Sequence, residues 1–268
     1  MVWDLGKRGL SLLIYGHRGA PAHFPENTLP SFEEALKSGA TTLETDIRVS
    51  LDGEVVVFHD ADARRLAGHR QSVETSNWRD VAEWDLGYAY QTPGGERPFV
   101  GKGFRAPRLH DLLTSFPDTP LNIDIKDGTD RAIDATLQVL RAAGAEKRVL
   151  LTSFHTRVRR RLLEYGYQGP LGFGIGQVLA LRFGPKFLLG FGRREGDRIQ
   201  IPLQQAGVRF ADADFISKMH ALNVAVDFWT INDPEVALNL KALGADGLVT
   251  DDPKLLAQSL QETSLSGE

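Results

Sequence analysis

The stretch "IRVSLDGEVVVFHD", residues 47–60, decides how the strands of this chain are counted. Two apolar runs flank Asp52-Gly53, and Asp-Gly between such runs is a signal for a tight β-hairpin. Only about ten residues separate the two runs, whereas a parallel neighbour needs a crossover of roughly a dozen or more. We therefore predict that the first of the two strands overshoots the sheet, turns and returns antiparallel.

Outside this hairpin, short β-rich runs alternate with amphipathic helical patterns nearly to the end of the 268-residue chain. Such alternation is typical of a parallel sheet with helices outside it. With the returning strand set aside, the remaining runs and the chain length predict an α/β fold, a (β/α)8 TIM barrel, with residues 1–268 in one domain. The eight runs cover residues 10–16, 41–47, 120–126, 148–154, 170–175, 198–203, 224–231 and 246–251.

Residues 61–107 fit this rhythm poorly. We predict that they form a small inserted cap over one end of the barrel, after the hairpin of the second strand. The alternative is a long disordered loop, which would leave six aromatic side chains without a core. These are Trp78, Trp84, Tyr88, Tyr90, Phe99 and Phe104.

Composition excludes several classes of protein. With 31 basic and 35 acidic residues the net charge is −4, so no global basic surface indicates a nucleic-acid partner. The chain has no cysteine, which excludes disulfides and thiolate chemistry and is typical of a reducing cytosol. The first apolar run lacks a signal-peptide cleavage site, and no stretch is apolar enough to span a bilayer. We predict a cytoplasmic protein.

Polar residues occur where the apolar strands stop, which is where a (β/α)8 barrel carries its functional residues. Glu44 and Asp46 are two apart and therefore share one face of their strand. We expect all of these side chains to meet at one mouth of the barrel. The set comprises His17, Arg18, Glu44, Asp46, His59, Asp124, Lys126, Ser153, Trp229 and Asn232.

Three carboxylates at one mouth would repel each other and raise one another's pKa. A hard divalent cation, Mg²⁺ or Ca²⁺, would resolve that repulsion, because both prefer carboxylate oxygen. Glu44, Asp46 and Asp124 are therefore candidate metal ligands. The alternative is a salt-bridge network of these acids with Arg18 and Lys126.

His17 and His59 are candidates for an acid–base pair, since one histidine can accept a proton while the other donates one. Arg18 and Lys126 would add fixed positive charge suited to a phosphate group. Pairing of Arg18 with Glu26 is an alternative that does not exclude this role. Glu26, in the loop after the first strand, and Trp229, at a strand end, are further substrate-binding candidates, although a tryptophan more often packs in a core.

Residues 177–194 are unusually apolar and follow the end of the fifth strand. From Arg157 to Arg198 the chain carries nine basic and three acidic residues, so 9 − 3 gives a local charge of +6. An apolar rim beside basic charge favours an anionic membrane surface or an acyl chain. The alternative is that the apolar side chains pack against the barrel and its cap.

Taken together, the motifs "HRG", "ENT", "ETD", "HD", "DIK", "WTIN" and "TD" resemble the glycerophosphodiester phosphodiesterases, over about residues 14–260. The resemblance implies a (β/α)8 barrel and a divalent metal held by Glu44, Asp46 and the acid of the third-strand motif. It further implies that His17 and His59 are the acid–base pair. The family usually has Glu before Ile-Lys where this chain has Asp124.

The resemblance implies an enzyme that hydrolyses glycerophosphodiesters to glycerol phosphate and an alcohol. A lysophospholipase D acting on lysophospholipids is the nearest competing hypothesis, with peripheral membrane contact through residues 177–194. Two further hypotheses are a non-catalytic phosphodiester-binding barrel and a metal-dependent barrel acting on sugars or enolates.

Overall fold

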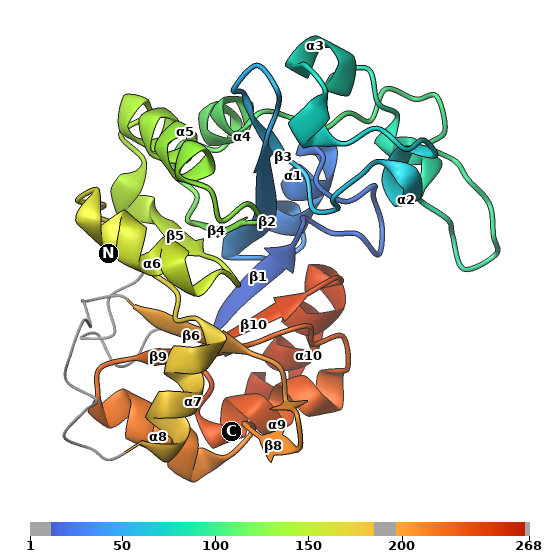
Figure 1. Ribbon diagram of the computed structural model, residues 1–268. Coiled ribbons are helices and arrows are strands. Elements are labelled where there is room, and N and C mark those ends of the chain that lie inside the picture. The colour runs from blue at the N-terminus through green and yellow to red at the C-terminus, as the bar shows by residue number, and fades with distance from the viewer. Residues whose placement is uncertain (1–11, 185–196, 266–268) are drawn as a thin grey trace.

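A curled parallel sheet forms the centre of the computed structural model, which describes residues 12–184 and 197–265 (Figure 1). Its strands lie in the order β5-β4-β2-β1-β10-β9-β6, with β3 paired to β2. The strands are β1 (Leu13–His17), β2 (Thr42–Val49), β3 (Val55–Val57), β4 (Leu121–Ile125), β5 (Val149–Thr152), β6 (Arg198–Ile201), β9 (Ala225–Phe228) and β10 (Gly247–Thr250). A separate two-stranded sheet joins β7 (Gln204–Gln205) to β8 (Val208–Arg209).

The hairpin predicted at residues 47–60 is confirmed. Strand β3 runs antiparallel to β2, with Ile47 opposite Val57 and Val49 opposite Val55. Gly53 in the turn has φ 98°, a left-handed conformation that favours glycine. Because β3 is a returning strand, it does not count among the parallel strands of the barrel.

Two isolated parallel bridges complete the ring between the edge strands β5 and β6. Leu151 pairs with Leu171, and Gly172 pairs with Arg198. The run predicted as a strand at residues 170–175 is therefore reduced to two bridges, because its proline and two glycines weaken regular pairing. The predicted TIM barrel fold is confirmed, except that the fifth of the predicted strands is represented only by these two bridges.

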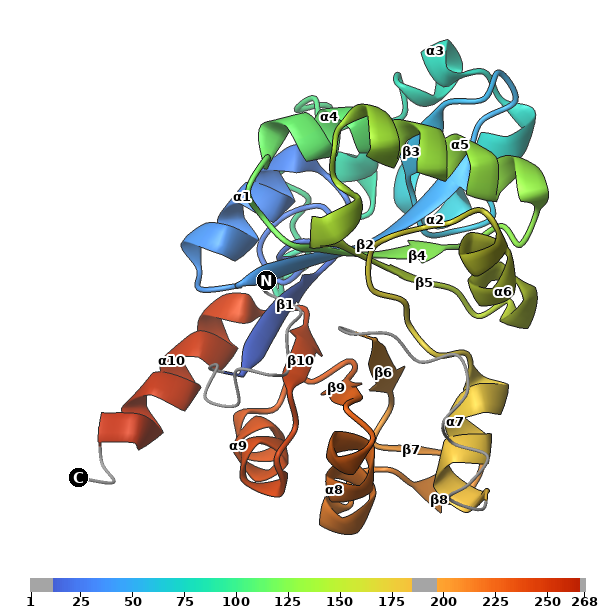
Figure 2. The ribbon, with the colours of Figure 1, turned by 90° about the vertical axis from the view of Figure 1, so that its left-hand side faces the viewer.

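Helices surround the sheet on its outside (Figure 2). The chain starts them with side-chain caps, as at Thr28, Thr129 and Asp233, whose oxygens accept backbone N–H groups of the first turn. Two large apolar clusters lie between helices and strands, one on each half of the barrel. The helices are α1 (Leu29–Lys37), α4 (Leu109–Ser115), α5 (Asp130–Ala142), α6 (Thr156–Glu164), α7 (Ile175–Phe183), α8 (Ala213–Ala221), α9 (Pro234–Leu243) and α10 (Pro253–Leu265).

Residues 61–107 fold into short elements beside β3, namely α2 (Arg64–Ala67) and α3 (Trp78–Val81) with 3-10 turns at Val73–Thr75 and Leu86–Tyr88. Trp84 is buried in a small core that this insertion shares with Val56 and Phe58 of the hairpin. A second aromatic group forms around Phe99, whose ring stacks on Phe24 and contacts Tyr90 and Phe104. The insertion is thus packed, while its role as a cap over the mouth stays a prediction.

Candidate active site

The register of the sheet brings the strand-end residues together. His17 is opposite Glu44 on neighbouring strands, and Asp46 is opposite Asp124. Their side chains border a cavity of about 280 Å³ at the carboxyl ends of the strands. The polar or aromatic residues predicted from strand ends that line it are His17, Arg18, Glu44, Asp46, His59, Asp124, Lys126, Ser153 and Trp229.

The "HRG" motif forms a tight turn that presents Arg18. Arg18 has a backbone φ of 55°, and the Arg18 backbone N–H donates to Glu44 Oε2 at 3.1 Å. Gly19 follows with φ 97°, and a side chain there would collide with Ser31. The left-handed backbone costs about 1–3 kcal/mol at a residue other than glycine. The turn thereby binds Glu44 through a backbone N–H group, while the Arg18 side chain contacts Glu26 and Asp46.

Each of the two candidate acid–base histidines, His17 and His59, is hydrogen-bonded to an aspartate. His17 Nδ1 lies 2.6 Å from Asp251 Oδ1, and His59 Nδ1 lies 2.6 Å from Asp60 Oδ1. A carboxylate that accepts the Nδ1 proton fixes the tautomer of a neutral ring and leaves Nε2 for proton transfer. Asn232 donates to the second oxygen of Asp251 at 2.7 Å.

Neither aspartate is among the site residues predicted from the sequence. A signal existed in both cases, because Asp60 directly follows His59 and Asp251 directly follows β10. Pairing over 234 positions, as between His17 and Asp251, is visible only once the barrel has formed.

The pKa of His17 is raised above its ordinary value. Burial lowers it, but the hydrogen bond to Asp251 and the charge of Glu44 outweigh burial. His17 therefore stays able to hold a proton in a site that is largely withdrawn from water.

The three acids differ in their charge environment. Burial, followed by the charge of Asp46, raises the pKa of Glu44 to about 7. Burial also raises the pKa of Asp124, whereas for Asp46 the charges of Lys126 and Arg18 outweigh burial and lower the pKa. Lys126 Nζ lies 2.7 Å from Asp46 Oδ1 and 2.6 Å from Asp124 Oδ2, so one ammonium forms ion pairs with two carboxylates.

The acids also have unused hydrogen-bonding capacity. Asp46 Oδ2 and Asp124 Oδ1 are buried and accept no hydrogen bond, although Arg18 Nε is 3.1 Å from the former. Across the described residues, no three or more His, Cys, Asp or Glu side chains are placed to hold a metal ion. The predicted salt-bridge network is present in part: Asp46 pairs with Arg18 and Lys126, and Asp124 pairs with Lys126. Glu44 accepts from the backbone N–H of Arg18 instead.

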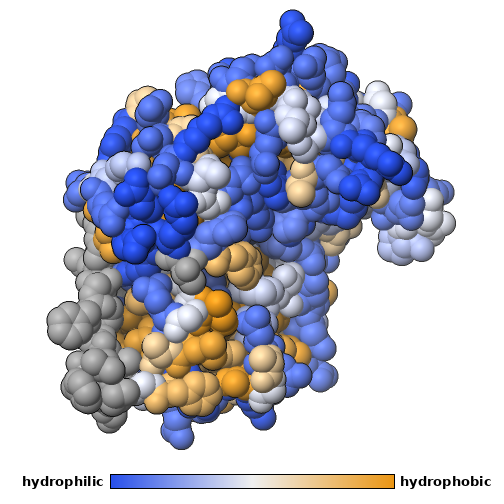
Figure 3. Space-filling model, viewed as in Figure 1, coloured by the Kyte–Doolittle hydropathy of each residue, from blue (hydrophilic) through white to orange (hydrophobic). Residues whose placement is uncertain are grey.

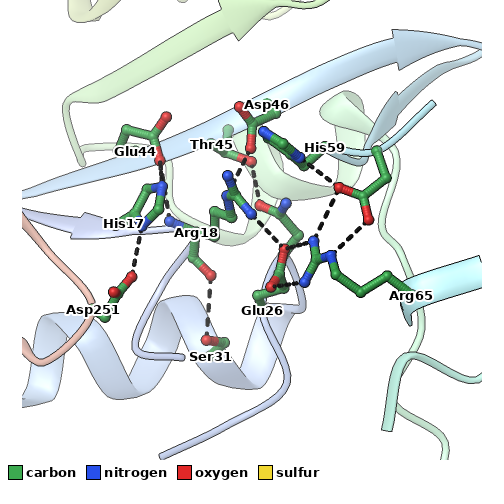
Figure 4. A network of polar contacts seen from close by, with 12 residues as sticks. His17, Arg18, Glu26, Ser31, Glu44, Thr45, Asp46, His59, Arg65 and Asp251 are labelled. Carbon is green, nitrogen blue, oxygen red and sulfur yellow. Dashed lines mark hydrogen bonds and ion pairs between the residues drawn. The ribbon is translucent and has the colours of Figure 1, made fainter. Parts of the chain in front are cut away.

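Glu26 supports Arg18 and does not line the cavity. Its Oε1 accepts from Arg18 Nη1 at 2.8 Å, as Figure 4 shows, and the two residues are 14% and 15% exposed. Trp229 does border the cavity, and its ring meets that of Phe154 edge-on with centroids 6.3 Å apart.

Besides its charged residues, the cavity has a set of apolar lining residues, the apolar wall. It includes the first residue of α7, and Leu179 and Phe183 of the same helix are exposed. Figure 3 shows apolar residues gathered over this helix. Residues 185–194 of the predicted apolar segment lie outside the described residues. Among helices within residues 12–184 and 197–265, none has the length and apolarity needed to cross a membrane. The apolar wall comprises Phe154, Phe173, Ile175, Val178, Ile201, Pro202 and Trp229.

Comparison with known proteins agrees with the motifs. The glycerophosphoryl diester phosphodiesterase family model matches residues 17–255. A "probable glycerophosphodiester phosphodiesterase 2" of Mycobacterium tuberculosis is 34% identical over 272 residues, which covers 96% of each chain. The lysophospholipase D GDPD1 of Rattus norvegicus is 25% identical over 273 residues, covering 92% of this chain and 86% of that protein.

Solved structures confirm the fold. An Oleispira antarctica phosphodiesterase, solved in complex with the product sn-glycerol-3-phosphate, has a TM-score of 0.72 at 20% sequence identity. The match covers 93% of this chain and 96% of that one. With the fold, the motifs and the family model in agreement, the chain belongs to the glycerophosphoryl diester phosphodiesterase family.

Proposed function

We propose that this chain hydrolyses glycerophosphodiesters to a glycerol phosphate and an alcohol. The observation that supports this most strongly is the pair of histidines, each held at Nδ1 by an aspartate, on one cavity with Arg18 and Lys126. The product in the Oleispira antarctica structure has the chemistry that such a site would release. A binding module would not need two oriented proton carriers.

In this proposal His17 is the general base and His59 the general acid. His17 takes the proton from the nucleophile, which is either water or the substrate's neighbouring hydroxyl. In the second case this step gives a cyclic phosphate, which water then opens to glycerol phosphate. The new P–O bond forms as the bond to the leaving alcohol breaks, and His59 gives its proton to the departing oxygen. Arg18 and Lys126 bind the phosphoryl oxygens as negative charge grows on the leaving group.

We further propose that Glu44, Asp46 and Asp124 hold Mg²⁺ or Ca²⁺. The donor chemistry fits a hard cation, because Asp46 Oδ2 and Asp124 Oδ1 accept no hydrogen bond and burial beside Asp46 raises the pKa of Glu44. Lys126 contacts the other oxygen of each of these two aspartates, so the cation and the ammonium would share both carboxylates. Bound there, the cation would supply Lewis-acid polarisation of the phosphoryl oxygens.

The test is release of glycerol phosphate and choline from glycerophosphocholine by the purified chain. Activity should vanish in EDTA and return with added Mg²⁺ or Ca²⁺. His17→Ala should lower kcat by about 10²- to 10⁴-fold, while Glu33→Gln, on the exposed face of α1, should match the wild type. No hydrolysis in the presence of either metal would overturn the proposal, and full activity in EDTA would overturn its metal part.

Lysophospholipase D activity is a second candidate, and the apolar wall favours it. An acyl chain extending from the phosphate past Ile175 would contact carbon on most sides. Ile175→Glu should therefore slow cleavage of lysophosphatidylcholine and leave glycerophosphocholine cleavage nearly unchanged. Leu255→Glu, exposed on α10, is the matched control. Equal losses on both substrates for Ile175→Glu would exclude an acyl-chain role.

Peripheral membrane contact through residues 177–194 belongs to the same proposal, and positive charge supports it less than the count along the chain suggests. Two of the nine basic residues from Arg157 to Arg198 are buried: Arg159 pairs with Asp197, and Arg198 pairs with Asp227. The segment also exposes apolar side chains, with Phe183 66% exposed. Phe183→Glu should weaken binding to anionic vesicles relative to Leu255→Glu, and equal binding by the two variants would count against contact.

A further inference from the structure

Arg65, in the first turn of the insertion, contacts two acids at once. Its Nε and Nη2 lie 2.7 and 3.1 Å from the two oxygens of Asp60. Its Nη1 and Nη2 lie 2.7 and 2.8 Å from the two oxygens of Glu26. The planar guanidinium thus engages both carboxylates with two bonds each, a geometry that an ammonium group cannot reproduce.

Each of these acids holds one residue of the proposed site. Asp60 Oδ1 is 2.6 Å from His59 Nδ1, and Glu26 Oε1 is 2.8 Å from Arg18 Nη1. Arg65 is therefore the middle of a continuous chain of contacts from His59 to Arg18, and Figure 4 shows the contacts of its guanidinium with Glu26. Arg65 itself does not line the cavity and is 48% exposed.

The charges of both acids depend in part on Arg65. Burial alone would raise the pKa of Asp60, but hydrogen bonds from His59 and Arg65 hold it below its ordinary value. Burial likewise opposes the charge of Glu26, and the hydrogen bonds from Arg65 are the largest contribution that lowers its pKa. Both groups therefore remain carboxylates that can accept from the residues they hold.

We propose that Arg65 is a positioning residue, which fixes Asp60 and Glu26 and through them the ring of His59 and the guanidinium of Arg18. This inference rests on the proposed function, because it takes His59 as the general acid and Arg18 as a phosphate ligand. It also gives the insertion a role that does not depend on the predicted cap. The segment that follows the "HD" motif supplies the Arg65 side chain, which links His59 to Arg18 through Asp60 and Glu26.

The experiment compares Arg65→Ala and Arg65→Lys with Arg64→Ala. Arg64 is the matched control, since it lies next to Arg65, is 64% exposed and pairs only locally, with Asp62. We expect Arg65→Ala to lower kcat on glycerophosphocholine by about 10- to 100-fold, within the range for a misplaced acid–base group. Arg65→Lys should lose less, free guanidinium should partly restore Arg65→Ala, and Arg64→Ala should match the wild type.

A leaving-group comparison separates positioning from general destabilisation. A glycerol 4-nitrophenyl phosphodiester releases 4-nitrophenolate, which departs without a proton. The losses in Arg65→Ala and His59→Ala should both shrink on this substrate, whereas the loss in His17→Ala should persist. An equal loss in Arg65→Ala on both substrates would overturn the positioning of His59, and kcat and KM within about twofold of wild type would overturn the positioning role as a whole.

A measurement without turnover keeps this inference distinct from the proposed function. In ¹H–¹⁵N spectra of the histidine side chains, the His59 imidazole signals, assigned with His59→Ala, should shift in Arg65→Ala and stay in place in Arg64→Ala. Unchanged signals would overturn the positioning role even for an inactive protein. Absent wild-type hydrolysis with shifted signals would overturn only the proposed reaction.

Discussion

Replacing Glu44 by glutamine should make the stability of the protein less dependent on pH. Burial and the charge of Asp46 raise the pKa of Glu44 in the folded protein to about 7, from 4.5 in the unfolded chain. A raised pKa means that the folded state holds the proton more tightly than the unfolded chain does. The contribution of this group to stability is therefore fully present below pH 4.5 and is lost as the pH rises through about 7.

The size of the effect follows from the two pKa values. The difference of about 7 − 4.5 corresponds, at 1.36 kcal/mol per pKa unit, to about 3 kcal/mol of unfolding free energy lost from pH 4.5 to pH 8. Because Glu44 is only 7% exposed, solvent screens this effect little. Glutamine keeps the size of the side chain and removes the titration.

The assay is urea unfolding in EDTA at pH 4.5 and pH 8, for the wild type, Glu44→Gln and the surface control Glu33→Gln. The gap between Glu44→Gln and the wild type should change by about 3 kcal/mol in favour of the variant as the pH rises. Glu33→Gln, at a site 59% exposed, should follow the wild type. Parallel pH profiles for Glu44→Gln and the wild type would refute the reasoning, because Glu44 would then be no more crowded than a surface acid.

The remaining predictions concern turnover. His17→Ala and His59→Ala should each lower kcat by about 10²- to 10⁴-fold in stopped assays, with a double variant that is less than additive; an additive double variant would separate their roles. Asp251→Asn should lower kcat with little change in Tm, since it releases the tautomer of His17, and unchanged kcat would dismiss that hydrogen bond. Asp46→Ala should abolish turnover in any added metal, whereas Asp124→Glu should keep most of it; activity of Asp46→Ala in EDTA would end the metal proposal.

Most of the barrel could be predicted because its signals are local. The Asp-Gly turn and the two apolar runs around it specify the β2–β3 hairpin within about fourteen residues. The prediction of a regular strand at residues 170–175 was wrong. Its apolar residues are typical of a strand, but its proline and glycines allow only two bridges. Apolar content predicts that a segment is buried, but a regular strand also needs backbone hydrogen bonds with the neighbouring strands.

The site divides in the same way. His17 and Asp124 could be found because they stand at or next to the ends of β1 and β4. Glu44 and Asp46 lie within the longer strand β2, and the parallel register places them beside His17 and Asp124. The charge count around residues 157–198 was less informative, since two of its arginines turned out to be buried in ion pairs. A count along the chain cannot tell an exposed charge from a buried one.

The sequence by itself determined which polar residues lie near the carboxyl ends of the strands. It also carries the motifs that place the chain in its family. Only the tertiary structure decided how those residues are held. Asp251 reaches His17 across 234 positions, and Arg65 reaches Glu26 across 39. Such contacts have no local signal, because they depend on the distance and direction between side chains on separate elements, which closure of the barrel fixes.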